Sequence, residues 1–471
     1  MLVRQITDDH LAQNAYLIGC QQTGEAIVID PERDIERYIA AAAKENLKLV
    51  AAAETHIHAD FLSGTRELAR RLPALHIYLS GDGGPDWLYE WPATDGRTVT
   101  FLHDGDTLRI GKIEIRAWYT PGHTPEHMSF VVTDHGGGAS EPMGVVSGDF
   151  VFVGDLGRPD LLETAAGVAG AREPSARRLH ESATAFLTLP DFMQVWPGHG
   201  AGSACGKALG AIPTTTVGYE RRFSPAIAEA ARGAQPFVDF ILSGQPEPPG
   251  YFARMKRLNK SGPPILESLP APLRLDARGL VEARAAMQVI DTRKDRKAFM
   301  RGHVAGSFFA PFDKSFPTVV GSLADPGKPI ALIIDEADLE AAVRDLVRIG
   351  YDDVRAWAPP SIDDEYRAAG GLEAAIESID FAEFERRRQA GPITVLDVRG
   401  AGEHAARHVP GAVNVAHTRL RVAPPALGPN RPVYVHCAAG VRSSVSAAYL
   451  AREGMPVVHV DGSFTGWKPA P

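Results

Sequence analysis

Two histidines and an aspartate lie close together near the start of the chain. His56, His58 and Asp60 stand in the run Thr-His-Ile-His-Ala-Asp-Phe, which follows the apolar stretch 50–53. That stretch indicates a short buried strand. Imidazole and carboxylate groups are common metal ligands, and residues this close in sequence can converge on one ion only from a tight loop at a strand end. The run therefore predicts a metal site directly after the strand.

Three further ligand-type residues occupy similar places downstream. Each follows an apolar run and stands in a turn that contains glycine: His123 in Pro-Gly-His-Thr, Asp149 in Ser-Gly-Asp and His199 in Pro-Gly-His-Gly. A lone histidine is more often a core or surface residue. Four strand ends in the order HxHxD, His, Asp, His instead favour one shared metal centre.

These motifs resemble those of the metallo-β-lactamase superfamily and, within it, of the persulfide dioxygenase branch. The resemblance covers roughly residues 1–245 and includes the run Gly-Asp-Leu-Gly-Arg-Pro-Asp at 154–160. It implies one Fe(II) per chain, held by His56, His123 and Asp149. Two histidines and one carboxylate leave positions open for O2 and substrate. By the same resemblance, His58, Asp60 and His199 would surround this set and orient ligands and waters.

Phe61 bears on the number of metal ions. Hydrolases of this fold carry HxHxDH, whose last histidine binds a second metal, whereas this chain has HxHxDF. A phenyl ring has no lone pair to donate, so one metal is favoured, although Asp60, Asp149 and His199 remain as donors for a second. Zinc serves hydrolysis by acidifying a bound water, whereas oxygen insertion needs a metal that shares electrons with O2. The alternative is a zinc thioester hydrolase resembling glyoxalase II.

A second reactive centre is predicted near the C-terminus. Cys437 follows the apolar stretch 432–436 and opens the run Cys-Ala-Ala-Gly-Val-Arg, after which 445–453 indicates a helix. A strand, a loop of small residues and a helix start place backbone N–H groups and the helix dipole around the sulfur, which stabilises a thiolate. Arg442 adds a fixed positive charge that can bind an oxyanion. Cys437 is therefore a predicted nucleophile.

The cysteine loop resembles that of rhodanese sulfurtransferases, over residues 381–471. The upstream runs Asp-Val-Arg at 397–399 and His-Val-Pro-Gly-Ala at 408–412 match the same family. Cysteine-dependent phosphatases of related fold have five residues between cysteine and arginine, whereas four lie between Cys437 and Arg442. The smaller loop favours a sulfane sulfur over a phosphate.

A middle segment repeats part of this pattern about a hundred residues upstream. The runs Asp-Thr-Arg at 291–293 and Gly-His-Val-Ala-Gly-Ser at 302–307 correspond to the later ones, which predicts a second domain of the same kind. When the two segments are aligned on their corresponding apolar strands, Asp335 takes the position of Cys437. Without a thiol, this segment resembles an inactive rhodanese.

These observations predict an α/β chain of three domains. An αββα metallo-β-lactamase fold at 1–245 is followed by two rhodanese-like, doubly wound α/β domains, an inactive one at 271–360 and an active one at 381–471. Stretches rich in Pro and Gly predict linkers at 246–270 and 361–380. The length of 471 residues agrees with about three domains.

Composition excludes several classes of partner. The net charge of −9 argues against nucleic acid, and no apolar run reaches the roughly 18 residues of a membrane helix. Residues 1–13 lack the apolar core of a secretory signal, and three cysteines form no disulfide framework. We expect a cytoplasmic homo-oligomer that acts on small molecules.

The combined resemblance is to fused persulfide dioxygenase–sulfurtransferases of bacterial sulfide detoxification. It implies oxidation of a thiol persulfide with O2 to sulfite, coupled to a rhodanese that forms or uses thiosulfate. Cys205, six residues after His199 in a loop of small residues, is a candidate to hold or pass a persulfide, and Arg158 is a candidate contact for a substrate carboxylate. A sensor or scaffold with decayed sites is disfavoured by the complete ligand set and the complete cysteine loop.

Overall fold

The computed structural model describes residues 1–471 apart from 98, 166, 208, 428–431 and 468–471. The chain divides into two compact units, one of Met1–Glu267 with Val347–Gly350 and one of Ser268–Leu346 with Tyr351–Pro471. Residues 428–431 and 468–471 of the predicted last domain lie outside the described residues. Within the described residues, no helix is long and apolar enough to span a membrane.

The first unit contains two six-stranded sheets. One has the order β1-β2-β3-β4-β5-β6 and the other β12-β11-β10-β9-β8-β7. The strands of the first are β1 (Leu2–Asp8), β2 (Gln13–Cys20), β3 (Glu25–Ile29), β4 (Lys48–Ala53), β5 (His76–Ser80) and β6 (Val99–Leu102). Those of the second are β7 (Thr107–Ile110), β8 (Ile113–Tyr119), β9 (Met128–Asp134), β10 (Gly144–Gly148), β11 (Gln194–Pro197) and β12 (Thr215–Thr216).

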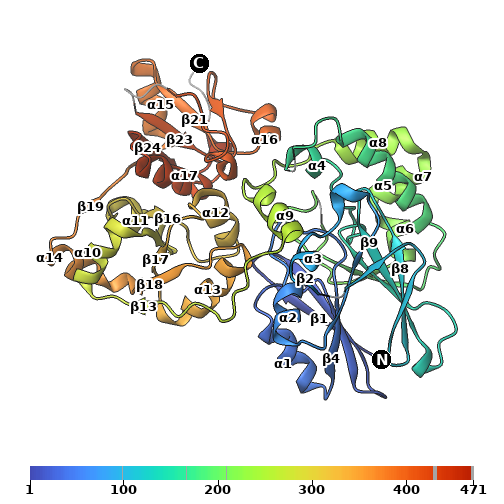
Figure 1. Ribbon diagram of the computed structural model, residues 1–471. Helices are drawn as coiled ribbons and strands as arrows, with labels where there is room; N and C mark the ends of the chain where they lie inside the picture. Colours follow the sequence, from blue (N-terminus) through green and yellow to red (C-terminus); the bar gives the residue numbers. More distant parts are fainter. Residues whose placement is uncertain (98, 166, 208, 428–431, 468–471) are drawn as a thin grey trace. The chain divides into compact units, whose positions relative to one another are not determined.

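Helices of the first unit flank the two sheets (Figure 1). They are α1 (Glu36–Lys44), α2 (Thr65–Arg71), α3 (Trp91–Thr94), α4 (Leu161–Thr164), α5 (Arg172–Phe186), α6 (Val217–Phe223), α7 (Pro225–Arg232), α8 (Ala234–Leu242) and α9 (Phe252–Ser261). Side chains alternate across a strand, so neighbouring residues enter different cores. On β2, Ile18 packs between the sheets while Leu17 packs with Tyr38 of α1. The predicted αββα layering is confirmed.

The ends of four strands bring the predicted ligands to one edge of these sheets. His56, His58 and Asp60 follow β4, and His123 follows β8. Asp149 comes directly after β10, and β11 ends two residues before His199. Because β10 and β11 are parallel neighbours, their ends lie side by side, so residues far apart in the sequence meet here.

The second unit contains two five-stranded sheets and a short two-stranded pair, β15-β19. The strands of the first sheet are β13 (Leu273–Arg274), β14 (Gln288–Asp291), β16 (Phe308–Phe309), β17 (Ile330–Ile333) and β18 (Val354–Ala358). Those of the second are β20 (Glu377–Asp380), β21 (Thr394–Asp397), β22 (Val413–Asn414), β23 (Val433–His436) and β24 (Val457–Asp461). The pair consists of β15 (His303–Val304) and β19 (Glu373–Ala374).

Both five-stranded sheets follow the same strand order when each is counted along the chain. The orders are β13-β18-β17-β14-β16 and β20-β24-β23-β21-β22, and all pairs are parallel. Asp335 follows β17 and Cys437 follows β23, which hold the same place in the two sheets. The repeated sequence pattern thus corresponds to a repeated strand topology.

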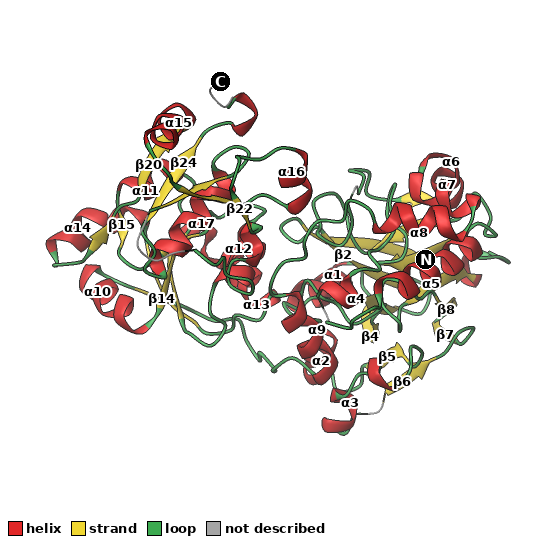
Figure 2. Cartoon of the chain, turned by 90° about the horizontal axis from the view of Figure 1, so that it is seen from above, coloured by secondary structure: helices red, strands yellow, loops and turns green. Residues whose placement is uncertain are grey.

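Helices cover these parallel sheets, as the alternation of strand and helix requires (Figure 2). They are α10 (Ala277–Ala286), α11 (Arg296–Arg301), α12 (Phe316–Leu323), α13 (Leu339–Arg348), α14 (Asp363–Ala368), α15 (Phe381–Ala390), α16 (Ala401–Ala406) and α17 (Val441–Arg452). The stretches predicted as linkers contain α9, at 246–270, and α14, at 361–380.

Candidate metal centre

The side chain of Asp30 holds the loop after β4 in place. The carboxylate of Asp30 accepts hydrogen bonds from the backbone N–H of Thr55 at 2.6 Å and from its hydroxyl at 2.8 Å. The same hydroxyl lies 2.9 Å from Nδ1 of His56. Nδ1 is thus engaged, and Nε2 is the nitrogen of His56 that remains for a metal.

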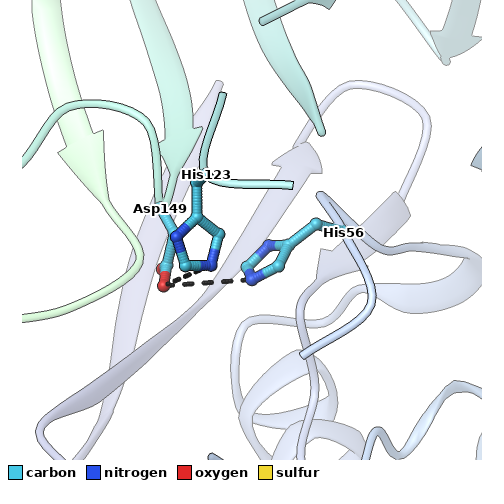
Figure 3. A group of neighbouring side chains, drawn as sticks. All are labelled: His56, His123 and Asp149. Atoms are coloured by element: carbon cyan, nitrogen blue, oxygen red, sulfur yellow. Dashed lines mark ion pairs between the residues drawn. The ribbon is translucent and has the colours of Figure 1, made fainter. Parts of the chain in front are cut away.

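Three buried side chains turn their donor atoms toward one point. The donor atoms of His56, His123 and Asp149 all lie within 4.8 Å of one another. Nε2 of His56 lies 3.9 Å, and Nε2 of His123 3.5 Å, from the same carboxylate oxygen of Asp149 (Figure 3). Each side chain is only 1 % exposed. Two imidazoles and one carboxylate in this arrangement can hold one cation by one face.

The protonation states of these groups suit a metal ion. Burial lowers the pKa of His56 and of His123 well below the usual value, so both rings are neutral and keep a lone pair. Burial raises the pKa of Asp149 to about 6. Among the described residues, neither carboxylate oxygen of Asp149 has a conventional hydrogen-bond partner. A buried carboxylate with so few hydrogen-bond donors is costly, and a cation between the three donors would offset that cost.

A second donor set adjoins the first. Asp60, His199 and Cys205 have donor atoms within 4.8 Å of one another, and all three are buried. Nε2 of His199 lies 3.2 Å from Asp60 and 3.4 Å from the second oxygen of Asp149. Burial, followed by Asp60 and Asp149, raises the pKa of the Cys205 thiol well above its usual value. The cysteine is therefore held protonated beside two acids, next to the predicted ligands.

His58 belongs to a third group of donor atoms, together with two buried acids. Its Nε2 lies 3.2 Å from Asp30 and 3.2 Å from Glu54. Burial lowers the pKa of His58, but the two carboxylates outweigh it and hold the pKa well above the usual value. The ring of Phe61, which is fully buried, lies 4.3 Å from the ring of His58, centroid to centroid. His58 thus forms an ion pair with these acids and is not among the three donors around Asp149.

His127 supports Asp149 and is absent from the residues predicted from sequence. Its Nε2 accepts the backbone N–H of Asp149 at 3.1 Å, and its Nδ1 lies 2.8 Å from the hydroxyl of Thr120. Burial lowers the pKa of His127 to about 3, so the ring is neutral with its proton on Nδ1. Gly148 has φ +51°, and a Cβ there would lie 2.8 Å from Nε2 of His127. The glycine is needed for this close approach.

Helix α9 supports the loop after β4, although its flanking prolines and glycines predicted a linker. The side-chain amide of Asn259 donates to the carbonyls of His58 at 2.9 Å and Phe61 at 2.7 Å. Its oxygen accepts the N–H of Ser63 at 2.9 Å. These three hydrogen bonds attach the loop to α9. No signal in the sequence links a residue 201 positions later to His58.

Lys256, on the same helix, places a buried positive charge in this region. The residue is 6 % exposed, and Nζ has no hydrogen-bond partner among the described residues. Nζ lies 5.1 Å from the ring centre of Trp87. Burial lowers the pKa of Lys256, while Glu126, Cys205 and Asp149 act in the opposite direction. A positive charge on Nζ would offset negative charge around the site.

Arg158 is enclosed by protein groups. The side chain is fully buried and pairs with Asp160 at 2.7 Å. Its remaining N–H groups donate to the carbonyls of Ala204 at 3.2 Å and Pro246 at 2.6 Å. These contacts tie down the backbone next to Cys205, and contact of Arg158 with a substrate stays a prediction.

The loop after β23 surrounds the sulfur of Cys437. The N–H of Gly440 donates to Sγ at 3.2 Å, and Cys437 is 1 % exposed. Helix α17 begins at Val441 and points its N-terminus toward this loop, as the sequence predicted. The guanidinium of Arg442 forms a bidentate salt bridge with the carboxylate of Glu403, with N–O distances of 2.6 and 2.8 Å. This pairing raises the pKa of Arg442 further and fixes the direction of its side chain.

Comparisons with known proteins match two parts of the chain to families. Residues 8–199 match the metallo-beta-lactamase superfamily and residues 380–470 the rhodanese-like domain. The mitochondrial persulfide dioxygenase ETHE1 of Bos taurus is 27% identical over 230 residues, which cover 48% of this chain and 76% of that protein. A hydroxyacylglutathione hydrolase-like protein of Homo sapiens is 30% identical over 187 residues, which cover 39% of this chain and 54% of that protein.

A solved structure extends the match over most of the chain. The metallo-beta-lactamase from Staphylococcus aureus subsp. aureus COL is 40% identical and superposes with a TM-score of 0.66. The match covers 76% of this chain and 98% of that structure. The αββα layers agree with this match. The chain therefore belongs to the metallo-β-lactamase superfamily and carries a rhodanese-like domain at residues 380–470.

Proposed function

We propose that the first unit is an Fe(II)-dependent persulfide dioxygenase and that Cys437 carries sulfur in a rhodanese reaction. The observation that carries the proposal is the set of His56, His123 and Asp149, with Phe61 in place of a further histidine. The substrate would be a low-molecular-weight thiol persulfide, and the two reactions together would remove sulfide. The likeness to a persulfide dioxygenase supports this reading.

The proposed oxidation balances without a further reductant. The terminal sulfur of R-S-SH takes both atoms of O2 to give R-S-SO2H, and water then cleaves the S–S bond to give R-SH and sulfite. One Fe(II), held by His56, His123 and Asp149, would share electrons with O2 and leave positions open for O2 and sulfur. Thr55 orients the ring of His56, and His127 holds the backbone of Asp149. A positive charge on the buried Lys256 would favour an anionic sulfur group.

The proposed transfer at Cys437 likewise balances. The thiolate attacks the outer sulfur of thiosulfate, an S–S bond forms, and sulfite leaves with the electron pair of the broken bond. The reverse step makes thiosulfate from sulfite and a Cys437 persulfide. The Gly440 N–H stabilises the negative sulfur. Residues 271–360, with Asp335 in place of the cysteine, form the inactive rhodanese-like domain of this proposal.

A zinc thioester hydrolase is the second candidate function. Asp60, His199 and Cys205 beside Asp149 are donors for a second ion, and the match to a hydroxyacylglutathione hydrolase-like protein favours the same reading. The missing histidine at Phe61 weighs against it.

Metal analysis together with O2 uptake tests the proposal. We expect about one iron per purified chain, and O2 uptake with at least one of the persulfides of glutathione, coenzyme A and cysteine. Two zinc ions per chain, with hydrolysis of a glutathione thioester and no O2 uptake, would establish the hydrolase instead.

Cys205 is proposed to hold or pass a persulfide beside the iron, whose positive charge would offset the two acids that disfavour the thiolate. Cys205→Ser should lower persulfide-dependent O2 uptake about fivefold to tenfold and leave the iron content unchanged, because the thiol is not one of the three ligands. Cys20→Ser, at a buried thiol of β2, is the matched control and should retain full uptake. Equal uptake in both variants rules out a role for Cys205 in oxidation.

A further inference from the structure

Three carbonyl groups of the Cys437 loop each contact a donor from outside the loop. The carbonyl of Ala438 accepts the backbone N–H of Phe464 at 3.0 Å. The carbonyl of Gly440 accepts Nε2 of His459 at 3.1 Å. The carbonyl of Ala439, between them, lies 3.4 Å from Nη2 of Arg296. The carbonyl of Ala439 and the N–H of Gly440 belong to the same peptide, so a contact that holds this carbonyl outward also holds the N–H that donates to Sγ of Cys437.

Of these three donors, Arg296 alone comes from residues 271–360, which contain no cysteine and are called the cysteine-free segment below. It is the first residue of α11, a helix that contacts α17 (Figure 1). Its guanidinium also pairs with Asp461, at 3.0 Å from Nη2 and 3.2 Å from Nε. Arg296 therefore joins the segment around β14 to the loop that follows β23.

Asp461 lies directly against the cysteine loop. Gly440 has φ +86°, and a Cβ there would lie 2.0 Å from Oδ1 of Asp461 and 3.3 Å from Nη2 of Arg296. The same oxygen accepts the N–H of Gly462 at 2.9 Å. An unpaired carboxylate at this place repels an anion bound by the loop. Arg296 cancels that charge while it holds the Ala439 carbonyl.

The cysteine-free segment also contacts the far part of α17. The guanidinium of Arg452, at the last turn, lies 5.3 Å from the ring centre of Phe308 on β16. Helix α17 lies between the two five-stranded sheets in both views (Figures 1 and 2) and contacts β16, β23 and β24. The helix that begins at the cysteine loop is thus packed against both halves of the unit.

We propose that Arg296 is a positioning residue of the sulfur-transfer site, and that the cysteine-free segment supplies it to shape the Cys437 loop for an anionic sulfur donor such as thiosulfate. This inference rests on the proposed role of Cys437. It gives the segment around 271–360 a part in the reaction although it has no nucleophile of its own.

Steady-state transfer of sulfur from thiosulfate to cyanide by the full chain tests the inference. Arg296→Ala should raise KM for thiosulfate about tenfold, as expected for loss of a hydrogen bond to a charged group. A defect that merely lowers the folded fraction reduces kcat and leaves KM unchanged, so the two causes are separable. Arg296→Lys, which keeps the charge beside Asp461, should recover part of the loss in KM.

Two further variants sharpen the test. Arg301→Ala removes an exposed arginine from the same helix and should behave as the unchanged chain. The double variant Arg296→Ala/Asp461→Asn removes the unpaired carboxylate and should bring KM back toward the original value. A KM unaltered by Arg296→Ala, or altered equally by Arg301→Ala, overturns the inference alone. A chain without any sulfur transfer overturns the role of Cys437 and this inference with it.

Discussion

Replacing His123 by alanine is expected to abolish persulfide-dependent O2 uptake. The change removes one of three buried donors and leaves Asp149, whose carboxylate oxygen lies 3.5 Å from the lost nitrogen. Loss of a group that only orients a ligand already costs about 10–100-fold in metal affinity or activity, so loss of a ligand should cost more than about 100-fold. Uptake is measured with an oxygen electrode and glutathione persulfide, and iron on the same sample.

The control for this variant is His76→Ala, at an exposed histidine of β5, which should retain iron and uptake. Thiosulfate:cyanide transfer by Cys437 reports on the second unit and should survive in both variants. If the His123 variant keeps full iron and full uptake, the three-ligand assignment is wrong and the donors around Asp60 and His199 must be considered instead.

The sequence predicted the donors of this site because each stands where a strand ends in a turn with glycine. Such positions are recognisable from local pattern, since apolar runs indicate strands and glycine permits the turn at Gly148. Strand β4, predicted at 50–53, was confirmed at Lys48–Ala53. Helix α17, predicted at 445–453, begins earlier, at Val441, because the cysteine loop leads directly into its first turn. The alternation of strands and helices predicted a layered α/β architecture, and the resemblance to the metallo-β-lactamase superfamily implied its αββα form.

Partners that are distant in the sequence could not be predicted in this way. The contact of Asn259 with the carbonyls of His58 and Phe61 depends on how α9 packs, and prolines and glycines at its flanks suggested a linker. Arg442 was expected to offer a charge for an oxyanion, yet Glu403 pairs with it across 39 positions. Pairing of this kind is a product of tertiary structure, which propensity does not contain.

The link between the two halves of the second unit has the same origin. The sequence repeat indicated a cysteine-free domain but assigned it no role. Arg296 lies 143 positions before Ala439, and only the packing of α11 on α17 brings them together. A segment without a nucleophile can therefore still take part in a site through one side chain.

Substituting Cys437 by serine should divert the product of persulfide oxidation from thiosulfate to sulfite and leave O2 uptake unchanged. A serine hydroxyl is a far weaker nucleophile than a thiolate at neutral pH and forms no persulfide. Thiosulfate should therefore fall by more than about 100-fold, while sulfite accumulates in proportion to the O2 consumed. Both anions are separated and quantified after reaction with glutathione persulfide, and the Cys20→Ser variant is the control.

Mixing the Cys437→Ser and His123→Ala variants, each of which keeps one reaction, tests how the two reactions are coupled. The Cys437→Ser chain still makes sulfite, and the His123→Ala chain still carries a competent Cys437. If sulfite passes through solution, a mixture of the two should form thiosulfate at a rate that rises with total protein concentration. If sulfite is passed within one chain, the intact chain should form thiosulfate faster than the mixture, and the difference should be largest at low protein concentration. Tethering fixes an effective concentration that dilution does not change.

Unchanged thiosulfate formation by Cys437→Ser alone would contradict the proposed division of labour, since no step at the first site joins two sulfur atoms into thiosulfate.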